Sequence, residues 1–289
     1  MKSNVFDTAL IFEGGGMRNS YSAGILNVLL EKGIYFDYVS GISAGSTHVF
    51  NYLLRDRIRA KRSFVDSVRD ENVAGIKNLL KGQGFFNSDY IFESWDPYPD
   101  SIISLETFYA NPAKIRIGAF NANTGRMKYW NKRQLNSMEK LRKAIRASSS
   151  LPYIMQPTEF EGQVYYDGGL GYGISLDMAL RDGYQKIFAV LTRPEGYRKE
   201  PIKHKELIKK SFKSYPHVAN AMITRYKRYN RDLDRLEKLK EEGKAYIVYA
   251  KNQAVESTET NLFKLQDNYE EGYFQGLNEY RDWLAFLGI

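Results

Sequence analysis

The chain has 289 residues, of which 43% are hydrophobic, and this is enough apolar material for one large core. It contains no cysteine, which excludes disulfides, thiol catalysis and thiolate metal sites. The formal net charge of +8 favours binding to anionic partners.

No stretch approaches the roughly 18 consecutive apolar residues of a membrane-spanning helix. The N-terminus leads almost directly into the first predicted strand, so no room is left for a signal peptide. His, Asp and Glu residues do not occur at metal-ligand spacing. We therefore expect a cytoplasmic protein that uses no metal and no other cofactor.

The first predicted strand, residues 8–13, runs into Gly14, Gly15 and Gly16 and then into an amphipathic helix at about 20–32. Glycines at a strand-to-helix junction leave backbone N–H groups exposed, and these suit a developing oxyanion. The alternatives are a plain glycine turn and a phosphate-binding loop, although neither G-K-[S/T] nor G-x-G-x-x-G follows.

A G-x-S-x-G pentapeptide, residues 41–45, separates a strand-like run at 35–41 from a helix-like run. This strand, sharp turn and helix are the context that a nucleophile elbow requires, with Ser43 as the nucleophile. Because the elbow is tight, side chains at Gly41 or Gly45 would crowd the neighbouring strand and helix.

An irregular stretch rich in aromatic residues, 82–104, comes next. It is interpreted either as a mobile flap over the site or as a packed connecting loop.

Two hairpins are predicted from turn residues between strand-like runs. The first joins residues 115–120 to 127–130 through N-T-G, and the second joins 157–160 to 164–166 through E-G.

Asp167, Gly168 and Gly169 directly follow the second hairpin. A carboxylate between a strand and two glycines is held on a defined backbone while its oxygens stay reachable, so Asp167 is a candidate base. An ordinary Asp-Gly turn is the alternative. The presence of the serine elbow favours the catalytic interpretation.

Strand-like and helix-like segments alternate along the chain, which predicts a three-layer α/β/α fold around a mainly parallel sheet. The core strands are expected at 8–13, 35–41, 115–121 and 186–192, and later helices at 137–148, 176–181, 202–212, 218–242 and 262–287. We expect a single domain over residues 1–289, of which 198–289 form a helix-rich, basic portion.

These motifs resemble, in order and spacing, those of bacterial patatin-like phospholipases. The matching residues are the glycine turn with Arg18, the elbow around Ser43, the stretch R-A-S-S-S-L-P at 146–152, and the D-G-G turn at Asp167. The resemblance implies a Ser-Asp dyad in place of a triad, an oxyanion hole of glycine-turn amides, and hydrolysis of acyl esters, often of lipids.

In this scheme, Asp167 accepts the hydroxyl proton of Ser43 as the serine attacks an ester. The amide of Ala44 assists the glycine-turn amides at the oxyanion. Arg18 either adds positive field or holds the turn through a carboxylate.

Two features depart from the family pattern. Asn19 stands where a further glycine is common, and Asn tolerates positive φ better than most residues. Residues 170–175 lack the expected proline-containing run. Asn19 keeps open the alternative of a non-catalytic protein of this fold that binds membranes or an acidic partner.

The three histidines offer little support for a Ser-His-Asp triad. His48 lies five positions after Ser43 on the predicted helix, where packing is expected. His204 and His217 lie in lysine-rich sequence typical of a surface. His217 follows the order Ser, acid, His of ordinary α/β-hydrolases and is the rival base.

Basic residues concentrate in the C-terminal portion, where 198–240 hold 14 Lys and Arg against 5 Asp and Glu. A predicted helix there carries an apolar stripe that includes Met222, Leu233 and Leu236. The stripe is interpreted either as core packing or as a contact with an anionic membrane. Nucleic acid is the less favoured partner, because no recognisable binding module accompanies the helix. The sequence does not define an oligomeric state.

Overall fold

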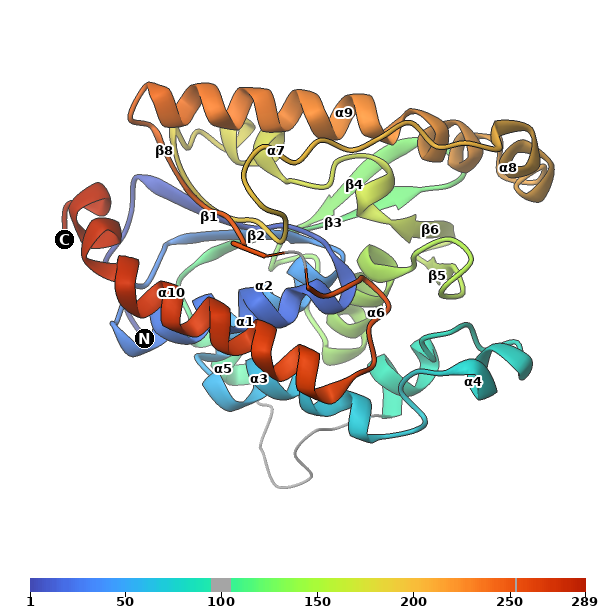
Figure 1. Ribbon diagram of the computed structural model, residues 1–289, viewed down its shortest axis with the longest axis horizontal. Helices are drawn as coiled ribbons and strands as arrows, with labels where there is room; N and C mark the ends of the chain where they lie inside the picture. The colour runs from blue at the N-terminus through green and yellow to red at the C-terminus, as the bar shows by residue number, and fades with distance from the viewer. Residues whose placement is uncertain (95–104, 253) are drawn as a thin grey trace.

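The computed structural model describes residues 1–94, 105–252 and 254–289. Within them, eight strands form one sheet in the order β5-β6-β3-β2-β1-β7-β8, with β4 paired to β3 (Figure 1). Strands β3, β2, β1, β7 and β8 are parallel, whereas β4 and β6 run antiparallel to β3, and β5 antiparallel to β6. The strands are β1 Thr8–Phe12, β2 Tyr38–Ile42, β3 Lys114–Asn121, β4 Arg126–Trp130, β5 Thr158–Phe160, β6 Gln163–Asp167, β7 Lys186–Val190 and β8 Ala245–Val248.

Helices cover both faces of the sheet, as the alternating pattern predicted. Figure 1 shows α7 and α9 over one face, and α1, α2, α6 and α10 over the other. The α-helices are α1 Asn19–Glu31, α2 Ala44–Leu54, α3 Arg57–Phe64, α4 Ile76–Leu80, α5 Leu105–Ala110, α6 Met138–Ser149, α7 Leu176–Arg181, α8 Lys205–Ser211, α9 Pro216–Glu241 and α10 Leu262–Leu287. Short turns of other helix types lie at η1 Gly16–Arg18, η2 Asp66–Arg69, η3 Tyr90–Ser94 and η4 Gly168–Leu170. No helix in the described ranges combines the length and the apolar character needed to cross a bilayer.

The predicted core strands and both hairpins are confirmed, and α7 and α10 begin and end at the predicted residues. The helices α3, α4 and α5 and the strand β8 were not predicted. Helix α3 reads R-I-R-A-K-R-S-F and buries only Ala60 and Phe64, so its apolar signal is weak. Strand β8 is a four-residue apolar run, and periodicity cannot assign so short a segment.

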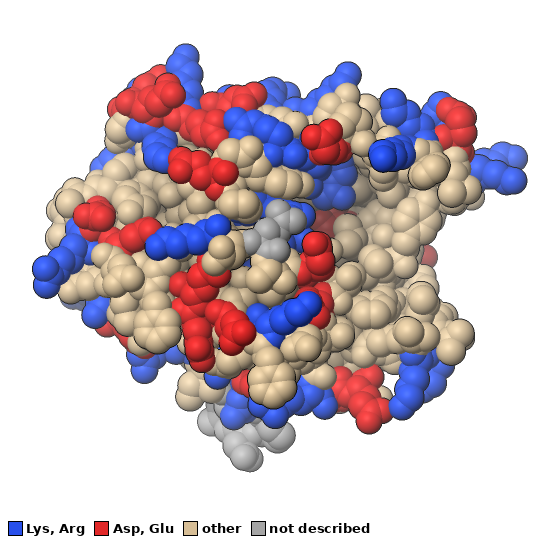
Figure 2. All heavy atoms as spheres, in the orientation of Figure 1, with Lys and Arg blue, Asp and Glu red and all other residues tan. Residues whose placement is uncertain are grey.

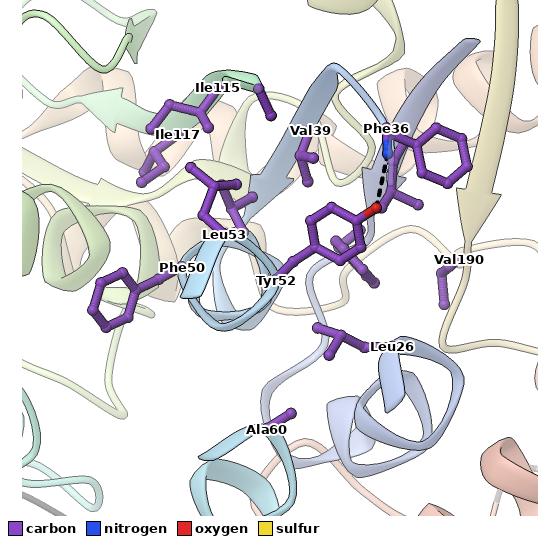
Figure 3. Packing of buried hydrophobic residues seen from close by; sticks show 14 of the residues in the cluster. Leu26, Phe36, Val39, Phe50, Tyr52, Leu53, Ala60, Ile115, Ile117 and Val190 are labelled. Carbon is purple, nitrogen blue, oxygen red and sulfur yellow. Dashed lines mark hydrogen bonds between the residues drawn. The ribbon is translucent and has the colours of Figure 1, made fainter. Parts of the chain in front are cut away.

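The main core lies between the sheet and helices α1, α2 and α10. In Figure 3, Leu53 points toward Val39 and Ile115 of the sheet, which fixes α2 against β2 and β3. The hydroxyl of Tyr52 accepts from the Phe36 N–H at 2.9 Å and donates to the Ile34 carbonyl at 2.7 Å. Because that buried hydroxyl is fully hydrogen-bonded, it locks the helix in place without leaving an unpaired polar group.

Helix α10 packs closely on α1, the helix that follows the glycine turn. A Cβ atom on Gly24 would lie 2.2 Å from the Tyr269 carbonyl oxygen, and one on Gly272 would lie 2.2 Å from that of Tyr21. Only glycines allow the two backbones to approach this closely. The C-terminal helix therefore supports the element that carries the turn.

Candidate active site

Strands β2 and β6 meet end to end along one edge of β3. The last residue of β2, Ile42, pairs with Gly118, and the last residue of β6, Asp167, pairs with the next residue of β3, Ala119. Strand β4 occupies the opposite edge over the same residues. Because β2 and β6 run in opposite directions, their carboxyl ends converge, and this brings Ser43 to Asp167.

Ser43 occupies a strained backbone position, with φ of 57° and ψ of −133°. The predicted crowding at the elbow glycines is present. A Cβ atom on Gly41 would lie 2.2 Å from the Gly45 carbonyl oxygen, and one on Gly45 would lie 2.4 Å from that of Phe12. Positive φ at a serine between two tightly packed glycines is the geometry of a nucleophile elbow.

The Ser148 side chain links the elbow to strand β3, a role that was not predicted. Its hydroxyl accepts from the Ser43 N–H at 2.8 Å and donates to the Gly118 carbonyl at 2.6 Å. The serine-rich stretch at 146–152 was noted as part of the family resemblance, but its contact with the elbow becomes visible only when α6 packs on β3.

Asp167 accepts a hydrogen bond from the Ser43 hydroxyl at 2.5 Å through Oδ2, and one from the Gly169 N–H at 2.7 Å through Oδ1. Only 3% of the residue is exposed. Burial raises the pKa of this carboxyl, while its hydrogen bonds to Ser43 and Gly169 and the charges of Arg225 and Lys199 oppose the rise. A raised pKa makes the carboxylate a stronger base toward the serine proton.

The amides of the glycine turn differ in what they contact. The Gly14 N–H donates to the Gly173 carbonyl at 3.3 Å, and the Met17 N–H donates to the Ser257 carbonyl at 3.1 Å. The Gly16 N–H donates no hydrogen bond in the part of the chain that the structure describes. The same holds for the Ala44 N–H, which opens helix α2.

Asn19 supports the turn through its side chain. The amide orientation that satisfies both ends has Oδ1 accepting from the Gly15 N–H and Nδ2 donating to the Glu13 carbonyl, each at 3.2 Å. Its φ of −69° is right-handed, so tolerance of positive φ is not what fits Asn to this position. Of the glycine turn, Gly16 has the left-handed backbone, with φ of 57°.

The histidines lie outside this constellation. His48 is fully buried, burial lowers its pKa to about 3, and its Nε2 lies 3.0 Å from the Asn19 carbonyl oxygen. His204 and His217 are exposed, and the ring of His217 lies against the turn at Gly125. The titratable side chain in contact with the Ser43 hydroxyl is therefore the carboxylate of Asp167.

An apolar cavity of about 160 Å³ opens beside Ser43 and Asp167. Its walls come from α2, α3, α6 and the segment between α4 and η3. The apolar lining residues are Met17, Ala44, Phe50, Phe64, Val73, Phe86, Ile91, Phe92, Met138, Leu141, Ile145, Leu151, Ile154 and Met155. Three residues of the predicted flap, Phe86, Ile91 and Phe92, thus contribute to the cavity wall, while residues 95–104 of that flap lie outside the described residues.

The apolar stripe of α9 is core packing, the first of its two interpretations. Met222, Leu233 and Leu236 are buried against the sheet. In the same helix, Arg228 donates from Nε to the Gly171 carbonyl at 2.8 Å and from Nη2 to the Leu170 carbonyl at 2.7 Å. Helix α9 therefore holds the segment that follows Asp167.

Metal ligation has no support in the described ranges, where no three His, Asp or Glu side chains converge on a common point.

Two sequence profiles match the chain. That of the family described as patatin-like phospholipase matches residues 10–180, which include the glycine turn, the elbow and Asp167. That of a domain of unknown function, DUF6363, matches residues 215–288, which include α9, β8 and α10.

Individual relatives are distant. The chain is 24% identical over 198 residues to the uncharacterized protein YjjU of Escherichia coli (strain K12), covering 64% of this chain and 52% of YjjU. It is 26% identical over 185 residues to the probable lipid hydrolase 463L of Invertebrate iridescent virus 6, covering 60% of this chain and 63% of 463L. The crystal structure of VipD from Legionella pneumophila superposes with a TM-score of 0.51 at 11% identity, over 94% of this chain and 66% of VipD, which is a likeness of fold. The chain thus spans between half and two thirds of the length of these proteins.

Proposed function

Since the chain belongs to the patatin-like phospholipase family, we propose that it is a serine hydrolase that cleaves lipid esters with Ser43 as nucleophile and Asp167 as base. The observation that carries the proposal is the 2.5 Å hydrogen bond from the Ser43 hydroxyl to the Asp167 carboxylate, inside a strained elbow.

The reaction proceeds through an acyl-enzyme. Asp167 takes the proton of Ser43 as the serine oxygen attacks the ester carbonyl, and the tetrahedral intermediate collapses with the alkoxide leaving and taking that proton. A water molecule then gives its proton to Asp167 and attacks the acyl group. The acid product departs, and the Ser43 oxygen recovers the proton.

Charge on the intermediate develops next to two N–H groups that have no acceptor among the described residues, those of Gly16 and Ala44. We assign these two as the principal oxyanion donors. Gly14 and Gly15 shape the turn, because their N–H groups already face Gly173 and Asn19.

The substrate class follows from the cavity beside the dyad. Its lining is mostly apolar, so it suits the alkyl part of a fatty acyl group and excludes a polar acid. Lipid esters fit such a site better than esters of short polar acids.

A comparison of variants tests the choice of base. Asp167→Asn should abolish hydrolysis of a long-chain ester, whereas His217→Ala should hydrolyse it at the wild-type rate. Circular dichroism would check that both variants are folded. Loss of activity in His217→Ala together with full activity in Asp167→Asn would contradict the proposal.

Access to lipid requires contact with a membrane surface, and helix α4 is suited to it. Exposed Ile76, Leu79 and Leu80 lie on this helix with Lys77, and Lys81 follows its last residue. The helix lies between Val73 and Phe86 in the sequence, and both line the cavity. Figure 2 shows a hollow between this side of the molecule and the α8–α9 side, walled mostly by uncharged side chains, with both basic and acidic side chains on the rims. We therefore propose that α4, and not the buried stripe of α9, contacts anionic membranes.

Vesicle sedimentation tests this contact. Leu80→Ser, which changes a side chain that is 83% exposed, should weaken binding to phosphatidylglycerol-containing vesicles roughly threefold to tenfold. Phe6→Ser is the matched control, since Phe6 is also exposed but lies near the N-terminus. Equal weakening by both substitutions, or by neither, would contradict the role of α4.

Residues 198–289 form part of the same folding unit in this proposal. Strand β8 pairs with β7 in the central sheet, and α10 packs on α1. A chain that ends at residue 197 should therefore aggregate or lose its cooperative unfolding transition. A well-folded truncated protein would show that the C-terminal part is a separate domain.

A further inference from the structure

Four cationic side chains gather on the side of the dyad that faces α9. They are Arg18 at the end of η1, Arg193 and Lys199 in the segment after β7, and Arg225 of α9. A Cβ atom built on Gly169 would lie 3.4 Å from Arg225 Nη2 and 2.9 Å from Asp167 Oδ1. Arg225 and the candidate base Asp167 therefore lie on either side of the same glycine. Burial, together with the charges of Arg225, Arg18 and Arg193, lowers the pKa of Lys199 to about 7. We call Arg18, Arg193, Lys199 and Arg225 the cationic recess.

The recess lacks matching carboxylates. None of its four side chains forms an ion pair in the part of the chain that the structure describes. Four of its buried nitrogens have no hydrogen-bond partner there, namely Arg18 Nε, Arg193 Nε and Nη1, and Arg225 Nε. Arg193 instead lies 4.5 Å from the centre of the Tyr197 ring, and Lys199 lies 4.5 Å from the centre of the Tyr229 ring.

The nearby anions do not neutralise the recess. The Glu13 oxygens are occupied by the Tyr229 hydroxyl at 2.6 Å and by Thr192, whose N–H donates at 2.7 Å and whose hydroxyl donates at 3.0 Å. Glu256, which acts on Arg18, is exposed to solvent. Asp167 is engaged with Ser43 and Gly169.

Partly buried cations without partners are unfavourable unless an anion joins them. Guanidinium groups present forked donors that match the oxygens of a phosphate, and a lysine adds a compact charge. Because Arg225 lies four residues before Tyr229 on α9, both side chains face the end of β1, where Tyr229 bonds to Glu13. The recess therefore presents N–H donors from η1, from the segment after β7 and from α9 to a bound anion.

The recess and the apolar cavity lie on different sides of Ser43. The cavity is walled by α2 and α6, which cover one face of the sheet, and Arg225 belongs to α9, which covers the other (Figure 1). An ester bound at Ser43 with its acyl chain in the cavity would direct its alcohol part toward α9.

We propose that Arg18, Arg193, Lys199 and Arg225 form a site that binds a phosphate group on the alcohol side of the ester, so that these side chains make the protein prefer a phosphate-bearing ester over its uncharged counterpart. This inference rests on the proposed function and narrows its substrate class.

Two esters with the same acyl chain test the inference, a monoacylglycerol and a monoacylglycerol phosphate, each presented in neutral detergent micelles. The wild type should prefer the phosphate ester by kcat/KM. Arg225→Gln should lower the ratio of the two kcat/KM values at least about tenfold, since it removes charge-assisted hydrogen bonds. The ratio cancels any change that the substitution makes to Asp167 itself.

Lys227→Gln is the matched control, because it removes the same charge from the same helix at an exposed position. It should leave the ratio unchanged. If Arg225→Gln folds poorly, Lys199→Gln should lower the ratio in the same direction. Cleavage of both esters with an unaltered ratio in both recess variants would overturn the phosphate assignment while leaving the hydrolase proposal intact.

A binding measurement separates the recess from catalysis and from free phosphate. Calorimetry with Ser43→Ala should detect glycerol 3-phosphate, and the double variant with Arg225→Gln should bind it at least about tenfold more weakly. Failure of the wild type to cleave either ester would overturn the hydrolase proposal, and absence of glycerol 3-phosphate binding would then overturn the recess as well. Inorganic phosphate binding with no preference between the esters would show a site for free phosphate and overturn the headgroup assignment.

Discussion

Two strands of the central sheet lead into a buried carboxylate, Glu13 just after β1 and Asp167 at the end of β6, and each residue is only 3% exposed. Glu13 accepts from the Tyr229 hydroxyl and from Thr192, so both of its oxygens are bound by groups that hold the fold. Asp167 has one oxygen fixed by Gly169 and the other against the hydroxyl of Ser43. The two carboxylates are therefore equally buried but differ in what they contact, and we propose that the contact with Ser43 is what gives Asp167 its catalytic role.

The largest expected effect comes from removing the base. Asp167→Asn should lower kcat for ester cleavage by roughly 10⁴-fold or more, in the range seen when members of serine-hydrolase catalytic groups are removed. The measurement is steady-state hydrolysis of a long-chain ester.

The same substitution should stabilise the fold. Since burial raises the pKa of Asp167 above its unfolded value near 3.8, ionisation of this group opposes folding at neutral pH. Asp167→Asn should therefore raise Tm at pH 7, and the gain should vanish as the pH falls to about 4. A lower Tm at pH 7 would contradict the assigned direction of the pKa.

A smaller loss is expected at the oxyanion turn. A Cβ atom on Gly16 would lie 2.3 Å from the Ser257 carbonyl oxygen, and the residue has φ of 57°. Gly16→Ala should shift the turn and lower kcat about 10²- to 10³-fold, as for loss of one oxyanion donor. Gly82→Ala is the control, because Gly82 also has positive φ but nothing within 4 Å, so its kcat should be unchanged.

Neutralising Glu13 should change the stability of the fold in the opposite direction from neutralising Asp167. Glu13→Gln leaves at least one of its buried donors unpaired and should reduce the free energy of unfolding by about 1–3 kcal/mol. Urea unfolding followed by tryptophan fluorescence measures this change. Stabilisation by Glu13→Gln would show that the two carboxylates do not differ as described.

At neutral pH the smallest expected effect concerns His48, a buried titratable group without a contact to Ser43 or Asp167. Burial lowers its pKa to about 3 from about 6.5, so its contribution is constant above pH 6.5 and is lost as the pH falls below that value. The wild type should lose stability relative to His48→Gln by about 1.4 kcal/mol per pH unit between pH 6 and pH 4. The acid limb of the activity profile should persist in His48→Gln, because Asp167 sets it.

Much of the fold could be predicted because β1, β2, β3 and β7 are mostly apolar runs next to a turn or a helix signal, whereas β8 was missed because it has only four residues. The glycine turn and the elbow were recognisable for another reason, because their backbones require glycine at fixed positions. The pairing of Ser43 with Asp167 followed from the resemblance and from the lack of a suitable histidine. The packing that produces it, two strands meeting on one edge of β3, depends on contacts distant in sequence.

Residues that support the site through contacts distant in sequence could not be predicted, because no local sequence pattern marks them. Ser148 holds the elbow from α6, Ser257 covers the glycine turn, and Arg228 of α9 fixes the segment after Asp167. The apolar stripe of α9 was compatible with both core and membrane, because periodicity shows that a face is apolar and not what covers it.

The most direct test of the account is labelling by a fluorophosphonate probe, with the modified residue located by peptide mass spectrometry. The wild type should be labelled stoichiometrically at Ser43, and His217→Ala should be labelled equally. Ser43→Ala should not be labelled, and Asp167→Asn should be labelled far more slowly. Absence of labelling at Ser43 in folded wild-type protein, or wild-type labelling in Asp167→Asn, would contradict a serine activated by this carboxylate.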